Sequence, residues 1–217
     1  MIKEISPSSL PKLAECALFE GASGTSAAAE RGTAVDVAIR NLIAGNELEP
    51  MAAVVGFDFS PIDFGVKQLK RLARHSFIET REEYLAMAVP GLSKLGTADA
   101  VCKEQKWVAD IKTGQVRDYR NQLMAYSLAC MEDNFEMSWT AHVIYVDQAM
   151  IRSYDFTYEE AKQGTQRVID RATSADAKPT PCEYCSWCKH YNNCHAIVRQ
   201  AESAIALIPE ATGNSIE

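Results

Sequence analysis

Apolar residues in the first third of the chain recur at three- and four-residue intervals, which predicts helices with one buried face. The clearest stripe consists of Val35, Ala38, Ile39, Leu42 and Ile43. Ser26 can cap the start of this helix, and Gly45 can end it. We expect helices over residues 8–19, 26–45 and 62–78, with a flexible break at 21–25 and a loop at 46–60.

Beyond residue 84 the pattern changes to short apolar segments bounded by turn-forming residues, which is typical of strands. The expected strands cover residues 84–89, 94–102, 107–111, 138–146 and 151–157. Helical patterns over 117–132, 158–175 and 195–207 are interleaved with them. This order predicts an α/β fold in which one mixed β-sheet is flanked by helices.

The length of 217 residues suits one domain, which we place at residues 1–208, followed by a disordered tail at 209–217. The chain is 47% apolar and 24% charged, as globular proteins are. No apolar run approaches the roughly 18 residues of a membrane span, and the N-terminal MIKEISPSSL lacks the apolar stretch of a signal peptide. We therefore expect a cytoplasmic protein without a membrane partner.

The formal net charge of −7 argues against indiscriminate coating of nucleic acid but allows a local basic surface. The densest basic stripe lies on one face of the third expected helix and consists of Lys67, Lys70, Arg71 and Arg74. Together with Arg117 and Arg120 it could guide a DNA backbone. A solvated helix face is the alternative interpretation of the stripe.

Two aspartates and a lysine form the most informative pattern. Asp110 and Lys112 are two apart on an expected strand, so they share a face. If the preceding hairpin turns at residues 103–106, Asp99 lies opposite Asp110 and Thr97 opposite Lys112. Like charges paired across strands are unfavourable unless a cation lies between them.

A hard divalent cation suits this arrangement. Asp99, Asp110 and the carbonyl oxygen of Ile111 could ligate Mg²⁺ or Mn²⁺, with waters completing the shell. Lys112 could then orient or deprotonate a water, or neutralise a phosphate. A solvated strand-end ion pair is the alternative for Asp110 and Lys112. Downstream, Gln122 and Tyr126 lie on one helix face and could bind phosphate oxygens or hold Lys112.

The series Gly96-x-x-Asp99, Asp110-x-Lys112 and Gln122-x-x-x-Tyr126 resembles the motifs of the RecB-like branch of the PD-(D/E)XK nuclease superfamily. This resemblance implies a restriction-endonuclease-like fold and metal-dependent cleavage of DNA, most naturally by an exonuclease acting on single strands or ends. The catalytic residues would be Asp99, Asp110, Lys112, Gln122 and Tyr126. A catalytically silent DNA-binding or scaffold subunit of a recombination or phage complex is the alternative.

The segment from Gly32 to Asp36 resembles the helical G-x-x-x-H motif of the same branch, whose last residue contributes to the metal site. Asp36 replaces that histidine and is itself an acceptable ligand for a hard cation. A polar point on an amphipathic helix is the alternative for Asp36. No Walker A motif is present, so any ATP-driven helicase or recombination activity would belong to a partner protein.

Seven cysteines and no signal peptide indicate a reducing compartment. Four of them form the pattern C-x2-C-x2-C-x5-C, which is typical of a zinc site or an iron–sulfur cluster; they are Cys182, Cys185, Cys188 and Cys194. A zinc-stapled adaptor without a nucleic-acid role is a third hypothesis.

The resemblance favours iron and sulfur, because AddB-type nucleases and CRISPR-associated spacer-acquisition exonucleases combine one N-terminal cysteine with a C-terminal C-x2-C-x5-C. It implies a [4Fe-4S] cluster on Cys16, Cys185, Cys188 and Cys194, with Cys182 as an alternative to Cys16. Such a cluster would clasp residues 1–25 and 178–200 around the nuclease core. The family context also implies a prokaryotic or phage-infected host cell.

Overall fold

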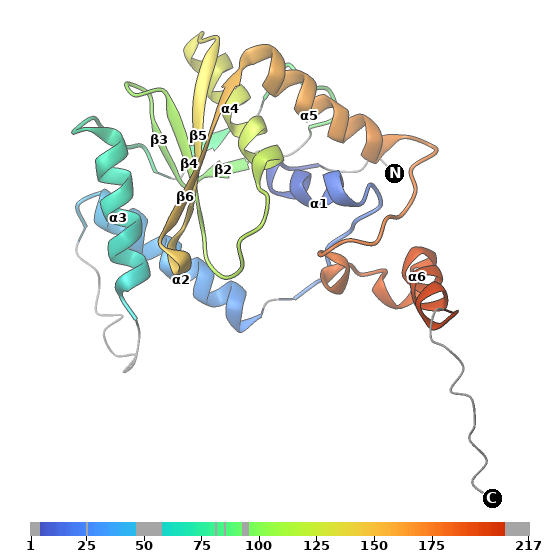
Figure 1. The fold of residues 1–217 in the computed structure, drawn as a ribbon. Helices are drawn as coiled ribbons and strands as arrows, with labels where there is room; N and C mark the ends of the chain where they lie inside the picture. Colours follow the sequence, from blue (N-terminus) through green and yellow to red (C-terminus); the bar gives the residue numbers. More distant parts are fainter. Residues whose placement is uncertain are drawn as a thin grey trace, which may run out of the picture.

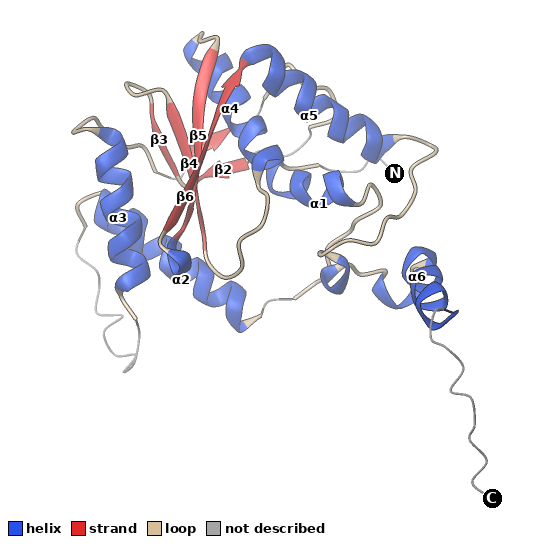
Figure 2. Cartoon of the chain, viewed as in Figure 1, coloured by secondary structure: helices blue, strands red, loops and turns tan. Residues whose placement is uncertain are grey.

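A four-stranded mixed sheet lies between two layers of helices in the computed structural model, which describes residues 5–24, 26–46, 58–80, 82–84, 86–92 and 96–206 (Figure 1, Figure 2). In order across the sheet, the strands are β3 (Ala100–Cys102), β4 (Trp107–Lys112), β5 (Ser138–Tyr145) and β6 (Met150–Thr157). β4 and β5 run parallel, and both outer pairs are antiparallel. The expected α/β architecture, a mixed sheet flanked by helices, is therefore confirmed.

The described residues include six α-helices, of which α6 lies apart from the sheet. They are α1 (Leu10–Glu15), α2 (Ala27–Ile43), α3 (Ser60–Ala73), α4 (Arg120–Asn134), α5 (Tyr158–Thr173) and α6 (His195–Ala206). Short 3₁₀ turns are η1 (Pro7–Ser9), η3 (Val146–Gln148), η4 (Cys185–Trp187) and η5 (Tyr191–Asn193). Within the described part of the chain, no helix is long and apolar enough to cross a membrane.

Side chains of β4 point alternately to the two faces of the sheet, and each face is covered by its own layer of helices. Val108 belongs to a core shared with α1, α4 and α5, whereas Ala109 and Ile111 belong to a second core shared with α2 and α3. Successive strand residues point to opposite faces, so Asp110 and Lys112 share the face that α4 covers. The strand therefore delivers both side chains to the side on which Gln122 lies.

Several element ends differ from expectation for local reasons. α1 stops at Glu15 because Cys16 adopts an extended conformation, and α3 stops at Ala73 because Arg74 is left-handed with φ 49°. Ser26 caps α2 as expected, accepting from Ala29 N–H. Residues 86–89 form turns rather than strand. The expected tail at 209–217 and most of the expected loop at 46–60 lie outside the described residues.

His142 on β5 makes the stability of the fold dependent on pH. It is 6% exposed, its ring Nδ1 lies 2.8 Å from Ser153 Oγ, and burial lowers its pKa from 6.5 to about 4 against a smaller opposing effect of Asp155. The folded state therefore holds the ring neutral where the unfolded chain already binds a proton. This contribution is complete above pH 6.5 and is lost as the pH falls from 6.5 towards 4.

We predict that His142→Gln flattens the pH dependence of stability. Between pH 7 and pH 4 the wild type should lose up to about 3 kcal/mol more unfolding free energy than the variant, measured by urea denaturation at each pH. The matched control is His75→Asn, which replaces an exposed histidine. Parallel pH profiles for the wild type and His142→Gln would contradict the prediction.

Candidate active site

The expected strand over 94–102 is interrupted at Asp99. Residues before it form β2 (Gly96–Ala98), which pairs with β1 (Glu82–Tyr84), and residues after it form β3, which pairs with β4. In the β3–β4 register Ala100 lies opposite Ala109, and Asp99 and Asp110 are the next residues beyond this last pair. Thr97 instead pairs with Glu83, so its expected position opposite Lys112 was wrong, because the chain changes partner strands at Asp99.

Both aspartates are held by main-chain or side-chain donors. The Oδ2 atom of Asp99 accepts a hydrogen bond from Ile111 N–H at 2.7 Å, and Oδ1 of Asp110 accepts one from Gln122 Nε2 at 3.1 Å. Gln122 Nε2 also lies 3.3 Å from the hydroxyl of Tyr126, which donates to the carbonyl of Thr97 at 2.9 Å. Gln122 and Tyr126, which we expected on one face of this helix, therefore orient Asp110 from α4.

Lys112 completes the group. Its Nζ lies 2.6 Å from Oδ2 of Asp110 and 4.7 Å from the centre of the Tyr119 ring. Burial alone would lower the pKa of Lys112, but attraction to Asp110 and Asp99 outweighs it and raises the pKa above its ordinary value. The amine is therefore held in its charged form beside a carboxylate.

Burial in the same group disfavours the charged form of the two aspartates. Burial raises the pKa of Asp99, and repulsion from Asp110 and Asp36 raises it further. Burial also raises the pKa of Asp110, although Lys112 counteracts it. Oδ2 of Asp110 is fully buried and has no neighbour within bonding distance except the Lys112 amine. A cation near these two carboxylates would relieve the repulsion, so their donor set fits a hard metal ion.

Asp36 lies on α2, close enough to Asp99 and Asp110 to raise the pKa of both. Its two carboxylate oxygens, however, accept hydrogen bonds from the guanidinium of Arg40, the first from Nε at 2.9 Å. In the ranges that the structure describes, no three His, Cys, Asp or Glu side chains converge closely enough to hold a metal. Asp36 thus borders the pair without joining it.

Two glycines of the motifs are explained by close packing. A Cβ on Gly96 would lie 2.5 Å from Cε1 of Tyr126 and 2.6 Å from Cγ of Pro7. A Cβ on Gly32 would lie 2.9 Å from Oγ1 of Thr113, where α2 passes the end of β4. These positions let β2 and α2 approach the site more closely than any side chain would allow.

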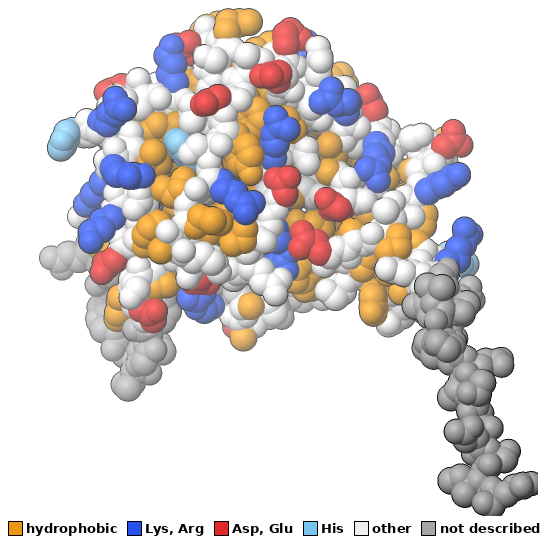
Figure 3. Space-filling model, viewed as in Figure 1, with side chains coloured by type: hydrophobic (Ala, Val, Ile, Leu, Met, Phe, Trp, Pro, Cys, Tyr) orange, Lys and Arg blue, Asp and Glu red, His pale blue; other side chains and the backbone are white. Residues whose placement is uncertain are grey.

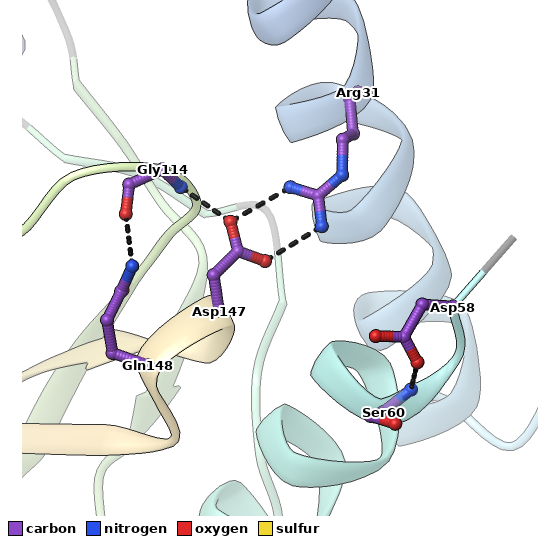
Figure 4. Close-up of polar contacts among 6 residues, drawn as sticks. All are labelled: Arg31, Asp58, Ser60, Gly114, Asp147 and Gln148. Carbon is purple, nitrogen blue, oxygen red and sulfur yellow. Dashed lines mark hydrogen bonds and ion pairs between the residues drawn. The ribbon is translucent and has the colours of Figure 1, made fainter.

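Residues 113–119, which follow Lys112, form a loop that is anchored at both ends. At the first end, Gly114 N–H donates to Asp147 at 2.7 Å, and Asp147 accepts a two-armed contact from Arg31 at 2.8 and 2.9 Å (Figure 4). Gln148 Nε2 donates to the Gly114 carbonyl at 2.6 Å. Figure 4 also shows Asp58 accepting from Ser60 N–H at the start of α3. Sequence patterns did not indicate Arg31 or Asp147, because they are distant in the chain.

The second end of the loop is held by the cysteine-rich segment. Arg117 lies 3.2 Å from a carboxylate oxygen of Glu183, and its guanidinium lies 4.4 Å from the ring centre of Trp187. The Arg117 side chain, which we expected to contact DNA, is only 14% exposed and is engaged by these partners within the protein. Arg120 is exposed at the start of α4.

The basic stripe on α3 is exposed along its whole length, from Lys67 through Lys70 and Arg71 to Arg74. Figure 3 shows Lys and Arg side chains gathered over the part of the surface where α3 lies. A DNA-binding role for the stripe and for Arg120 stays a prediction.

The two cysteine-bearing segments lie side by side, as Figure 1 shows. Gly21 pairs with Cys188 in an antiparallel bridge, Ala22 N–H donates to the carbonyl of Trp187, and Lys189 N–H donates to that of Glu20, both at 2.9 Å. Residues far apart in the sequence therefore meet through main-chain hydrogen bonds.

None of the seven cysteines, all of which lie in the described ranges, forms a disulfide bond. The sulfurs of Cys182 and Cys185 are 3.9 Å apart, and Thr180 N–H points to Sγ of Cys16 at 3.4 Å. Burial raises the pKa of Cys182 to about 11, with further increases from Cys185 and Cys16. Only the sulfurs of Cys182 and Cys185 lie close together among the described residues, where no three cysteine side chains converge closely enough to hold a metal, so a thiolate-bound metal group stays a prediction.

Comparisons with known proteins show no matching family model and no matching curated protein. A solved structure titled "Crystal structure of SSO0001" is similar over 86% of this chain and 85% of that chain, at 17% identity and a TM-score of 0.41. We draw nothing about function from this distant likeness.

We predict that Gly96→Ala loosens the packing of Tyr126 and destabilises the fold by about 1–3 kcal/mol, because the new methyl group overlaps the Tyr126 and Pro7 rings. Urea unfolding measures the loss. The matched control is Gly21→Ala, whose Cβ would be 4.0 Å from Phe19, its nearest contact, so its effect should stay within about 0.5 kcal/mol. Equal stability of both variants would show that Gly96 is not needed for close approach.

Proposed function

We propose that the chain is a metal-dependent DNA nuclease of the PD-(D/E)XK type that acts on single strands or strand ends. The observation that carries the proposal is the grouping of Asp99, Asp110 and Lys112 at the junction of adjoining strands. Two carboxylates and one amine in a buried group match the needs of phosphodiester hydrolysis, in which charge builds on the phosphate oxygens.

Each residue has a separate task in this proposal. Asp99 and Asp110 would hold Mg²⁺ or Mn²⁺, together with the carbonyl oxygen of Ile111. The bound ion would supply a more acidic water and neutralise charge on the phosphate. Lys112 would position the attacking water or stabilise the phosphate oxygens. Gln122 and Tyr126 would keep Asp110 in place through their hydrogen-bonded chain.

A silent DNA-binding or scaffold subunit is the second candidate, and Asp36 favours it. In this family the corresponding residue is a histidine that contributes to the metal site, whereas Asp36 is paired with Arg40. If Asp36 does not leave Arg40, the ion would be held by Asp99 and Asp110 with more waters in its shell.

We predict cleavage of labelled DNA by the wild-type protein with Mg²⁺ or Mn²⁺, and a rate reduced by about 100-fold or more in Lys112→Ala, because a charge beside the reacting phosphate is lost. Single-stranded and duplex substrates are followed on denaturing gels. The matched control is Lys103→Ala, which removes a half-exposed lysine paired with Glu79 at the opposite end of the hairpin.

The outcomes separate the two candidates. Cleavage that survives in Lys112→Ala would exclude this lysine from the reaction. A wild-type protein that contains its metal group, binds DNA and cuts no substrate with either ion would favour the silent subunit.

We further propose that the cysteine segments carry a structural [4Fe-4S] cluster on Cys16, Cys185, Cys188 and Cys194. The paired segments 20–22 and 187–189 support this proposal because they already hold the two cysteine groups together. Zinc is the alternative occupant. Cys182 competes with Cys16 as the fourth ligand, since its sulfur also lies beside that of Cys185.

We predict that protein purified without oxygen is brown and contains iron and sulfide in equal amounts. Cys16→Ser should lose most of the iron, whereas the matched variant Cys182→Ser should keep it. The reverse result would assign the fourth position to Cys182. Stoichiometric zinc without iron would reject the cluster.

A further inference from the structure

Trp187 is the only tryptophan of the chain that reaches the surface. Trp107 and Trp139 are 3% and 2% exposed, whereas Trp187 is 46% exposed. A large aromatic side chain kept half in water forgoes much of the stabilisation that burial would give. Its position therefore calls for a local reason.

Trp187 is the outer member of an aromatic cluster. The ring of Phe19 lies edge-on to that of Tyr184 at 6.3 Å, and Tyr184 lies 5.9 Å from Trp187 in a tilted arrangement. Phe19 and Tyr184 are buried, so they hold the inner side of the cluster in the core. The Arg117 guanidinium lies 4.4 Å from the ring centre of Trp187, and Glu183 holds that guanidinium. The exposed ring is thus held from two sides.

The aromatic cluster adjoins the loop at residues 113–119, which follows Lys112. Arg117 is five positions beyond Lys112 in the chain, which limits their separation to about 18 Å even if the loop were fully extended. Tyr119 of the same loop covers Lys112 at 4.7 Å and packs against the core that contains Tyr184. Side chains of this loop therefore contact both groups, Tyr119 at Lys112 and Arg117 at Trp187.

We propose that Trp187 is a stacking platform for one unpaired base of a single-stranded DNA whose backbone passes Lys112. The inference rests on the proposed nuclease function and adds the reason for a preference between strands. A flat aromatic ring stacks on any exposed base, whereas bases inside a duplex are already stacked and unavailable. The guanidinium of Arg117, which lies over the ring at 4.4 Å, adds a positive charge that suits the neighbouring phosphate.

The test uses the full chain purified without oxygen, in buffer without divalent metal so that no strand is cut. Three labelled probes of about 12 nucleotides are titrated: a single strand, its duplex, and a single strand of the same length in which all bases are absent. Trp187→Leu keeps apolar bulk without an aromatic face, and Trp187→Phe keeps a smaller one. Iron content and circular dichroism check that each variant is folded.

We expect Trp187→Leu to weaken binding of the single strand by about tenfold and Trp187→Phe to weaken it less. Binding of the duplex and of the base-free strand should change little in either variant. In the wild type, the single strand should quench tryptophan fluorescence. This signal reports Trp187, because the other two tryptophans are buried.

The platform is rejected if the wild type binds the single strand without quenching, or if Trp187→Leu weakens the base-free strand as much as the normal one. The wild-type quenching decides the question even if Trp187→Leu fails to fold. Binding and quenching without cleavage after Mg²⁺ is added would reject the nuclease but keep the platform. If Trp187→Leu cleaves DNA and binds the single strand with normal affinity, the platform is rejected and the nuclease proposal is kept.

Discussion

Burying two carboxylates side by side is the most demanding interaction in this protein. Burial raises the pKa of both Asp99 and Asp110, repulsion from Asp110 adds to the rise at Asp99, and repulsion from Asp36 acts on both. Three donors offset this cost: Ile111 N–H, the amide of Gln122 and the amine of Lys112. Two of these donors lie on β4 and the third on α4, so the strand register and the position of α4 depend on one another.

The setting of α4 shows how the fold meets this demand. Every residue from Gln122 to Met131 is buried, because the helix lies between the sheet on one side and α1 and α5 on the other. A helix buried on all sides cannot rotate without losing apolar contacts. Gln122 and Tyr126 are therefore held towards Asp110 by packing elsewhere on the helix. Gly96 adds to this precision by letting β2 reach the Tyr126 ring.

Local patterns in the sequence were sufficient for the features that repeat along the chain. The period of the apolar residues predicted α2, α5 and the strands β4 to β6 within a few residues, and the expected hairpin turn at residues 103–106 agrees with the pairing of Cys102 with Trp107. The change of partner strand at Asp99 has no periodic signal, since an apolar run reads the same on either side of it.

Contacts between distant residues were out of reach for a different reason. Arg31 and Asp147 are 116 positions apart, and Arg117 and Glu183 are also far apart in the chain. Each residue alone has the pattern of an ordinary surface charge, and only the folded topology brings the partners together. The pairing of Asp36 with Arg40 is local, yet the sequence could not decide it, because Asp36 has two competing positive partners, a metal ion and an arginine.

The two ends of the loop after Lys112 connect the acidic group to the termini of the fold. One end is tied to α2 through Gly114 and Asp147, and the other is tied through Arg117 to a segment that itself pairs with residues 20–22. Contacts between chain ends close nearly the whole chain into a loop, yet the entropic cost of closure grows only slowly with length. A few main-chain hydrogen bonds, such as those between residues 20–22 and 187–189, can therefore secure them. Because the same segment carries Glu183 and Trp187, anything that loosens the cysteine-rich end also frees Arg117, and with it the backbone that positions Lys112.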